Sequence, residues 1–240
     1  MDTVNVNGVQ INIIYEDADA IVFVKPYGML SQSAEGSDEK SVLEYISEYL
    51  HGEEVFPVHR LDRTTGGVMI AAKTRGAAAA LSTVIASDGM KKTYLAAVHG
   101  VPAGGILDDV LFFDRRKSKS FVIKKGTTRK GAKRALLEYE RISTSTCAAG
   151  EVSLVRVRLM TGRTHQIRVQ MANAGHPLLG DGKYGGRDNR CRCALWSHEI
   201  AFEHGALADV CLKKGAFRQA LEQGVSLRAD PPNEYPWNIF

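Results

Sequence analysis

The feature that most constrains the fold of this chain is a series of short apolar segments with strand character, each followed closely by a turn. Residues 11–15 and 20–24 are rich in β-branched and aromatic side chains and are separated by the acidic turn 16–19. Pro26 cannot donate a ladder hydrogen bond and therefore ends the second segment. Similar patterns predict further strands at 68–72, 92–98, 134–141, 152–159 and 194–202.

Helical signals are fewer than strand signals. Ser41 and Glu44 have the spacing of a capping box and predict that a helix begins at residue 42. The expected helices are 42–50, 77–86 (capped by Thr74), 164–174 and a short one through 219–221. We find no repeat and no regular alternation of strands and helices. The pattern predicts an α+β fold with a mixed, mostly antiparallel central sheet flanked by helices.

The 240 residues are enough for one large domain or two small ones. The first residues lack both a basic flank and an apolar core, so we expect no signal peptide. The longest apolar runs, such as 20–24, are too short to span a bilayer. We therefore expect a cytoplasmic, monomeric protein that does not bind a membrane.

The cysteines do not have the spacing of a disulfide framework; they are Cys147, Cys191, Cys193 and Cys211. Cys191 and Cys193 lie near His198 and His204, but this ligand spacing is atypical for zinc. We expect thiols here and no metal ion.

Positive charge is concentrated in residues 115–134, called here the basic segment. It holds ten Lys or Arg residues and no acidic residue, whereas the other 220 residues carry 21 basic and 27 acidic side chains. Such a cluster is typical of a polyanion-binding face, although a solvated loop or exposed hairpin is the alternative. The candidate RNA contacts within it are Lys117, Lys119, Lys124, Lys125, Arg129 and Lys130.

Residues 59–67 place one carboxylate, Asp62, between Arg60 and Arg63 and just before an expected strand. Neighbouring positive charge favours the ionised carboxylate, and turns at strand ends often present reactive groups. From these residues alone, Asp62 either caps the turn or pairs with one of the arginines, or it is a reactive anion.

A second polar segment covers residues 159–170. On a helix, Thr164 and Arg168 share one face while Ile167 and Met171 lie on another. Two interpretations stay open. The segment is a surface helix that docks its apolar face, or it presents a guanidinium to an anion, which is a phosphate or Asp62.

The sequence His-Arg-Leu-Asp at 59–62, with Thr65 and Gly67, resembles the signature of the RluA-type pseudouridine synthases. Further elements resemble that family in order and spacing, at 24–31, 92–100, 161–168 and 175–185. The resemblance covers about residues 13–204. It implies the pseudouridine synthase fold with a central active-site cleft. It also implies one catalytic domain over 1–240, with a motif-bearing core at 11–204 and a C-terminal extension at 205–240. We expect no S4-like RNA-binding domain, because the first strand starts near residue 9.

The resemblance implies isomerisation of uridine to pseudouridine in ribosomal or transfer RNA, without a cofactor or metal. Asp62 is the essential carboxylate in that family's pattern, and Arg168 is its expected ion-pair partner. Tyr94 is expected to stack on the flipped base and to help remove the C5 proton. Three roles for Asp62 stay open: attack on the ribose, attack on the base, and promotion of 2′-proton loss.

Other residues of the matched motifs are expected to contact RNA. Arg60 fills the space that the flipped base vacates or binds a phosphate, and the remaining candidates are Arg63, Thr65, Arg163, Thr164 and His165. We expect His59 and His165 to act mainly as structural hydrogen-bonding residues, and Asp181 to fix the glycine-rich turn near Tyr184. The chain departs from the family pattern at Thr64, Gly66 and Gln170. Two other function classes are an RNA-binding protein without catalysis and a sugar hydrolase, which needs a second positioned acid.

Overall fold

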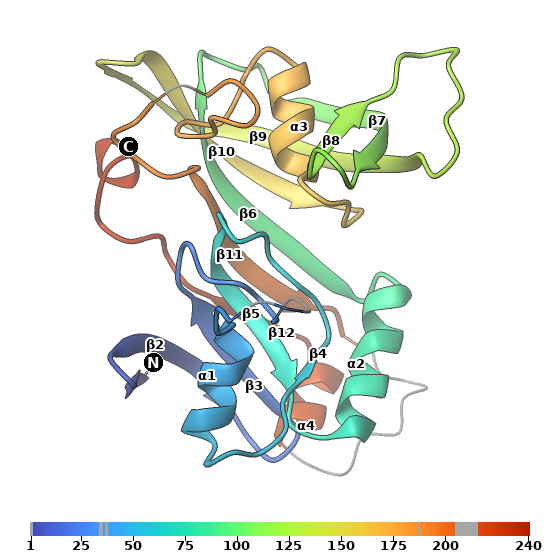
Figure 1. The fold of residues 1–240 in the computed structure, drawn as a ribbon, viewed down its shortest axis with the longest axis vertical. Coiled ribbons are helices and arrows are strands. Elements are labelled where there is room, and N and C mark those ends of the chain that lie inside the picture. Colours follow the sequence, from blue (N-terminus) through green and yellow to red (C-terminus); the bar gives the residue numbers. More distant parts are fainter. Residues whose placement is uncertain (1, 34–35, 37, 187, 205–215) are drawn as a thin grey trace. The chain divides into compact units, whose positions relative to one another are not determined.

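The computed structural model describes residues 2–33, 36, 38–186, 188–204 and 216–240 (Figure 1). The chain forms two compact units: residues 1–92 with 197–230, and residues 93–196 with 231–240. One catalytic domain over 1–240 stays a prediction. Cys211 and the start of the expected C-terminal extension, 205–215, lie outside the described residues.

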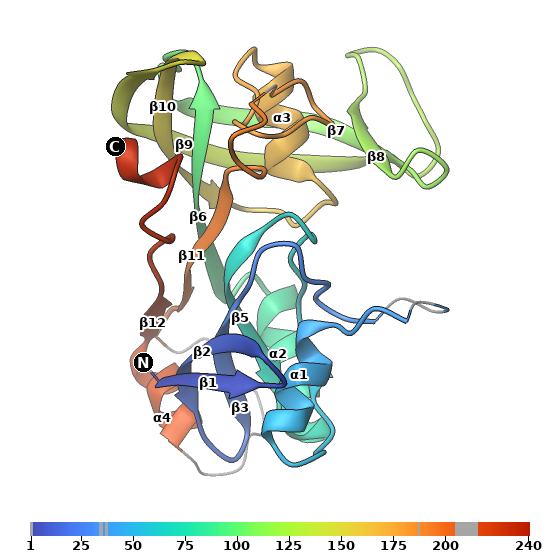
Figure 2. The same ribbon diagram turned by 60° about the vertical axis from the view of Figure 1, so that its left-hand side comes forward.

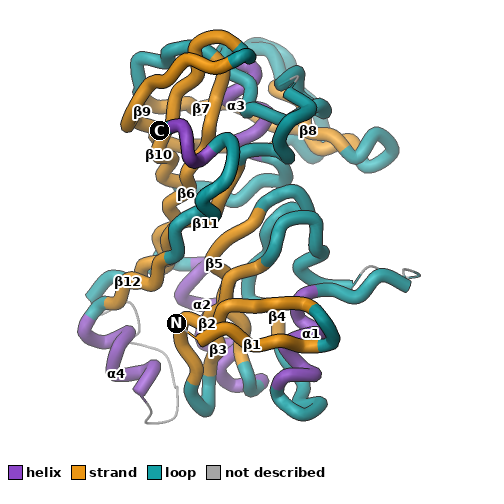
Figure 3. The backbone as a smooth tube through the Cα atoms, turned by 90° about the vertical axis from the view of Figure 1, so that its left-hand side faces the viewer, coloured by secondary structure: helices purple, strands orange, loops and turns teal. Residues whose placement is uncertain are grey.

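The first unit is built on antiparallel strands. Its strands are β1 (Asp2–Val6), β2 (Val9–Glu16), β3 (Ala20–Lys25), β4 (Phe56–Pro57), β5 (Gly66–Ala72), most of β11 (Leu195–Phe202) and β12 (Val225–Arg228). The first three pair in chain order and β3 then pairs with β5, while β4 also pairs with β5 and β12 with β11. Its helices are α1 (Val42–Tyr49), α2 (Arg75–Ala86) and α4 (Ala216–Gln223), drawn in purple in Figure 3.

The core of this unit lies between β5 and α2. All seven residues of β5 are buried, so the strand reads as a continuous apolar run rather than an alternating one. Leu81 and Val84 on α2 are fully buried in the same cluster as Ile70 of β5. Burying an aliphatic side chain of this size contributes roughly 1.5–3 kcal/mol.

The second unit is also an antiparallel sheet, and Figure 2 shows α3 beside it. Its strands pair in the order β6 (Met90–His99), β10 (Gly150–Leu159), β9 (Lys133–Cys147), β7 (Gly105–Asp114) and β8 (Lys119–Val122). β6 begins in the first unit with Met90. α3 (Gln166–Asn173) contacts β7 and β8, and a 3-10 turn (Trp237–Ile239) lies near the chain end.

The α+β class and most of the expected elements are confirmed. Both caps are present: Ser41 and Glu44 form the capping box of α1, and the Thr74 hydroxyl accepts a hydrogen bond from Ala77 N (3.1 Å). α3 begins later than expected, at Gln166, because His165 has a left-handed backbone (φ +55°) that a regular helix does not accommodate.

The sequence did not predict β1, β4, β7, β8 or β12. The basic segment spans the turn from β7 to β8, the strand β8 itself and the loop that leads to β9. The segment therefore includes part of a β-hairpin, and its binding to a polyanion stays a prediction. None of the described helices is both long enough and apolar enough to cross a membrane.

Gly67 has the tightest backbone contact near the 59–67 motif. Its φ is +113°, and a Cβ atom there would lie 2.2 Å from Ser197 O and 2.7 Å from Ser197 N. Gly66, one of the departures from the family pattern, is a buried residue at the start of β5.

We expect Gly67→Ala to lower the free energy of unfolding by at least about 2 kcal/mol, because backbone atoms of Ser197 must move and the backbone angle is strained. Urea unfolding measures this change. The matched control is Gly76→Ala on α2, where nothing lies within 4 Å. It should be neutral or should raise stability by up to about 1 kcal/mol. Equal losses of unfolding free energy in both variants would contradict the close approach of Gly67 to the Ser197 backbone.

Candidate active site

The loop that carries Asp62, residues 59–65, is called here the HRLD loop. Residues 25–31, the early segment, hold it by paired backbone contacts. The Ser31 hydroxyl donates to Leu61 O (2.7 Å) and accepts from Leu61 N (3.0 Å). Gly28 N donates to Arg63 O (2.9 Å), and Arg63 Nε donates back to Gly28 O (2.9 Å). The backbone on both sides of Asp62 is therefore fixed by a second segment of the chain.

Lys25 is a fully buried cation of the same region that the sequence did not single out as a site residue. Its Nζ donates to Met29 O (2.7 Å) and Pro26 O (3.0 Å). Burial lowers the pKa of Lys25 to about 7; the negative charge of Asp62 opposes this shift and the positive charge of Arg63 adds to it. The sequence signal that could have identified Lys25 is its position in the 24–31 segment, which resembles an element of the family.

Asp62 itself is half-buried, and its backbone carbonyl accepts a hydrogen bond from Thr65 N (2.9 Å), which closes the turn. Arg63 forms an ion pair with Glu39 (3.0 Å), and Arg60 is exposed. Among the described residues, the buried Thr64 hydroxyl has no hydrogen-bond partner. A bound ligand or water can satisfy such a group.

His59 supports the loop as a neutral acceptor. Ile70 N on β5 donates to its Nε2 (3.0 Å). Burial of the ring, with the positive charge of Lys92 as the second cause, lowers the pKa of His59 to about 3. This geometry agrees with the structural role expected for His59.

In the second unit, Arg168 on α3 is buried and bidentate. Its Nε and Nη2 donate to Asp181 Oδ2 and Oδ1 at 2.7 and 2.8 Å, and the Asp181 side chain is completely buried. The sequence predicted Asp62 as the partner of Arg168, and that pairing stays a prediction. Because Nε and Nη2 of Arg168 donate to Asp181, a pair with Asp62 would have to use the guanidinium edge that includes Nη1. The Asp181 carbonyl also accepts from Tyr184 N and Gly186 N, which confirms its expected role in the glycine-rich turn.

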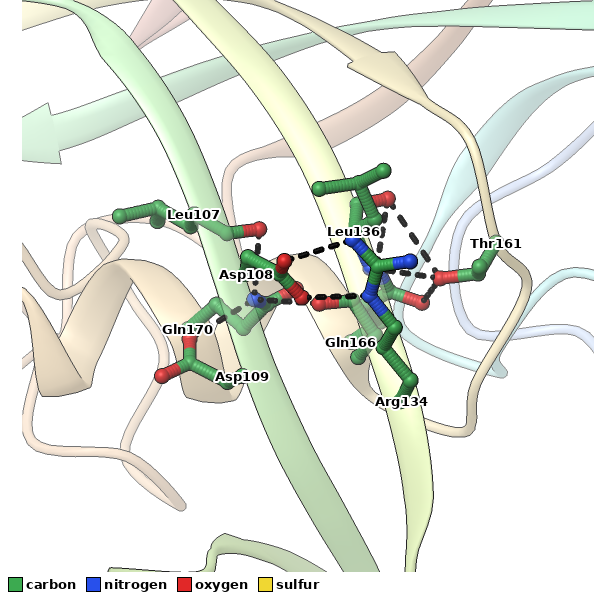
Figure 4. A network of polar contacts seen from close by, with 9 residues as sticks. Leu107, Asp108, Asp109, Arg134, Leu136, Thr161, Gln166 and Gln170 are labelled. Atoms are coloured by element: carbon green, nitrogen blue, oxygen red, sulfur yellow. Dashed lines mark hydrogen bonds and ion pairs between the residues drawn. The ribbon is translucent and has the colours of Figure 1, made fainter. Parts of the chain in front are cut away.

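Two glutamines tie α3 to the sheet of the second unit (Figure 4). The Gln166 Nε2 donates to Leu136 O (3.1 Å), and its Oε1 accepts from Thr161 Oγ1 (2.8 Å). Gln170, where the family often has His, is buried and donates to Asp109 Oδ2 (2.8 Å). The departure at Gln170 therefore has a structural function, which is to anchor α3.

The other predicted site residues of this unit differ in exposure. Tyr94 is buried on β6 opposite Val157 of β10. Arg163 is half-buried and donates to Arg134 O (2.9 Å), while Thr164 is exposed.

The basic segment contains both exposed and structural cations. Lys119 is half-buried and donates to Lys183 O, and its ammonium lies 4.9 Å from the ring centre of Tyr184. Arg129 lies 3.5 Å above the ring of Phe112. The exposed members of the predicted set are Lys117, Lys124, Lys125, Arg129 and Lys130. Across the described ranges, no three His, Cys, Asp or Glu side chains form a group that could hold a metal ion.

A family model for RNA pseudouridylate synthase matches residues 19–173, more than half of the chain. The chain belongs to this family. The matched stretch of this pseudouridine synthase includes the HRLD loop, Tyr94 and Arg168. The resemblance found in the sequence is thereby confirmed.

Named relatives agree with this assignment. The synthase is 35% identical over 210 residues to Uncharacterized RNA pseudouridine synthase YjbO of Bacillus subtilis, with 85% of this chain and 71% of that one covered. It is 32% identical over 209 residues to Ribosomal large subunit pseudouridine synthase D of Zymomonas mobilis, with 83% and 63% covered. It is 29% identical to tRNA pseudouridine synthase C of Vibrio parahaemolyticus, with 90% and 94% covered.

A solved structure confirms the fold. The human RNA Pseudouridylate Synthase Domain Containing 1 superimposes with a TM-score of 0.71 over 96% of this chain and 94% of that one, at 21% identity. The predicted pseudouridine synthase fold is therefore confirmed for this synthase.

We expect the stability of the synthase to rise between pH 7 and about 10 more than that of a Lys25→Met variant. The native state releases the Lys25 proton near pH 7, whereas the unfolded chain keeps it up to the ordinary value of 10.5. Stability therefore increases with pH across this window, by at most about 1.4 kcal/mol per pH unit. Urea unfolding at several pH values measures it. Lys91→Met, at an exposed lysine paired with Asp88, is the control and should not remove the rise. Parallel curves for the wild type and Lys25→Met would contradict the buried charge.

Proposed function

We propose that this chain isomerises uridine to pseudouridine in ribosomal or transfer RNA, with Asp62 as its essential carboxylate. Family membership supports the reaction class. The Zymomonas relative is named for the large ribosomal subunit and the Vibrio relative for tRNA, so both RNA classes belong to the proposal. The proposal further takes the protein as a cytoplasmic monomer that needs no metal or cofactor.

The observation that carries the proposal is the setting of Asp62. The backbone on both sides of it is held by Ser31 and Gly28, and the buried amine of Lys25 lies close enough for the two side chains to interact electrostatically. Each of the three routes considered for this reaction requires an ionised group.

In the proposed reaction the C1′–N1 bond of the target uridine breaks and the uracil rotates. A C5–C1′ bond then forms, C5 loses a proton and N1 gains one, so no oxidant or reductant is needed. Tyr94 stacks on the base and assists loss of the C5 proton, and Arg168 pairs with Asp62. Base flipping delivers the uridine to these groups.

RNA binding in this proposal uses the exposed cations of the basic segment together with Arg60, Arg163 and Thr164. Lys117, Lys124 and Lys125 are exposed, as phosphate contacts require. Lys119 is assigned a structural role instead, because its ammonium binds Lys183 O.

We expect Asp62→Asn to abolish pseudouridine formation while RNA affinity stays within about tenfold of the wild type, because the amide cannot supply the negative charge. Release of tritium from C5-labelled uridine in RNA measures turnover, and filter binding measures affinity. Glu39→Gln, an exposed carboxylate paired with Arg63, is the control and should keep most of the activity. Turnover by Asp62→Asn would overturn the assignment. Binding without any turnover in the wild type would favour an RNA-binding protein without catalysis.

We expect replacement of Lys117, Lys124, Lys125 and Lys130 by Gln to weaken RNA binding and to reduce the slope of log affinity against log salt by about three, since each phosphate contact releases counterions. The control replaces Lys40 and Lys91, which pair with Glu48 and Asp88 in the first unit. This control should leave the slope unchanged. An unchanged slope in the first variant would mean that the basic segment does not bind RNA.

A further inference from the structure

The hydroxyl of Tyr184 connects three parts of the second unit. It accepts a hydrogen bond from Ser120 N on β8 (2.8 Å) and lies 2.9 Å from Nδ1 of His165. The guanidinium carbon of Arg168 lies 5.2 Å from the centre of the Tyr184 ring. One half-buried side chain therefore contacts the basic segment, the 161–168 motif and the buried ion pair.

The hydrogen-bond roles at this hydroxyl bear on the tautomer of His165. Ser120 N is always a donor, so the Tyr184 oxygen accepts from it. Two arrangements then satisfy the contact with His165: the hydroxyl donates to an unprotonated Nδ1, with the ring proton on Nε2, or a protonated Nδ1 donates to the second lone pair of the same oxygen. Burial raises the pKa of Tyr184, so the hydroxyl keeps its hydrogen at neutral pH.

The orientation of the His165 ring is fixed by the same surroundings. The rings of Tyr184 and Phe113 both meet it edge to face, at centroid distances of 5.7 and 6.2 Å. The backbone of His165 has φ +55°, a conformation that costs energy for a residue other than glycine. The surrounding contacts offset this cost, which is typical of a position where orientation matters.

The link to the basic segment is reinforced by neighbouring contacts. The Ser120 hydroxyl donates to Thr164 O (2.5 Å), and Lys183 Nζ donates to Ser118 O (2.8 Å). Since Lys119 donates to Lys183 O, the β8 hairpin and the glycine-rich turn hold each other in both directions.

We propose that Tyr184 is a positioning residue for the isomerisation. Its hydroxyl donates to Nδ1 and so holds His165 in the Nε2–H tautomer, and its ring fixes the guanidinium plane of Arg168 together with Asp181. Through Ser120 it also ties both groups to the hairpin that carries the basic segment. The effect on turnover rests on the proposed function, whereas the tautomer of His165 does not.

The first test needs no activity. Nitrogen-15 NMR of the full chain, above the usual titration range of imidazole, distinguishes protonated from unprotonated ring nitrogens, and His165→Gln identifies the His165 signals. We expect a single tautomer with Nε2 protonated in the wild type. In Tyr184→Phe, which keeps the ring and loses the hydroxyl, the signals should show a mixture of tautomers. A protonated Nδ1 in the wild type, or an unchanged spectrum in the variant, would overturn the proposal.

The second test separates positioning from binding. For Tyr184→Phe we expect kcat to fall about tenfold while KM for RNA changes less than about twofold, because orientation is lost and the phosphate contacts remain. Tyr139→Phe on β9, which removes a tyrosine hydroxyl from the same unit, is the control and should keep both values. An unchanged kcat in Tyr184→Phe would refute the positioning role.

The two tests also separate this proposal from the proposed function. If the wild type forms no pseudouridine but His165 shows the expected tautomer and its change, the proposed function fails and the link from Tyr184 to His165 stands. If the wild type is active and the tautomer differs, the proposal for Tyr184 fails alone.

Discussion

The candidate site depends first on the hydrogen bonds between the early segment and the HRLD loop. A carboxylate on a surface turn samples many positions, and a reaction at a single carbon atom requires one. Ser31 contacts both backbone groups of Leu61, and Gly28 exchanges hydrogen bonds with Arg63. Because these contacts are made to the backbone of Leu61 and Arg63, they fix the position of the Asp62 backbone without competing for its carboxylate. The tight fit of Gly67 against Ser197 holds the strand that follows.

Buried charge is the second constraint, and the two units stabilise their buried cations with different partners. In the first unit Lys25 is buried among carbonyl oxygens, and its pKa falls because these dipoles do not fully replace water. In the second unit Arg168 meets Asp181 in a bidentate pair, which satisfies both partners at the cost of desolvating them. Such a pair is weak support for stability, but it gives the guanidinium a defined plane.

The local part of this architecture could be predicted from the sequence. Short apolar segments located β2, β3 and β6, alternating hydrophobicity located β10, and the caps at Ser41 and Thr74 located α1 and α2, because these signals act within a few residues. The strands β7 and β8 were missed. Phe112 pairs with Phe121 and Leu111 with Val122 in this hairpin, but the apolar residues of β8 lie inside the run of cations, which masks their pattern. The partner of Ser31, the burial of Lys25 and the contact from Arg168 to Asp181 depend on tertiary packing. Spacing along the chain does not encode which distant carbonyl or carboxylate such a side chain will meet.

Lys25 has a chemical consequence that extends beyond electrostatics. An amine whose pKa lies near 7 is unprotonated in a large fraction of molecules at neutral pH, and an unprotonated amine is a nucleophile. The fully buried position keeps it from reagents in solution as long as the early segment and the HRLD loop stay together. Its rate of acylation is therefore set by transient local opening, and this single side chain serves as an internal probe of how often the loop around Asp62 separates from its support.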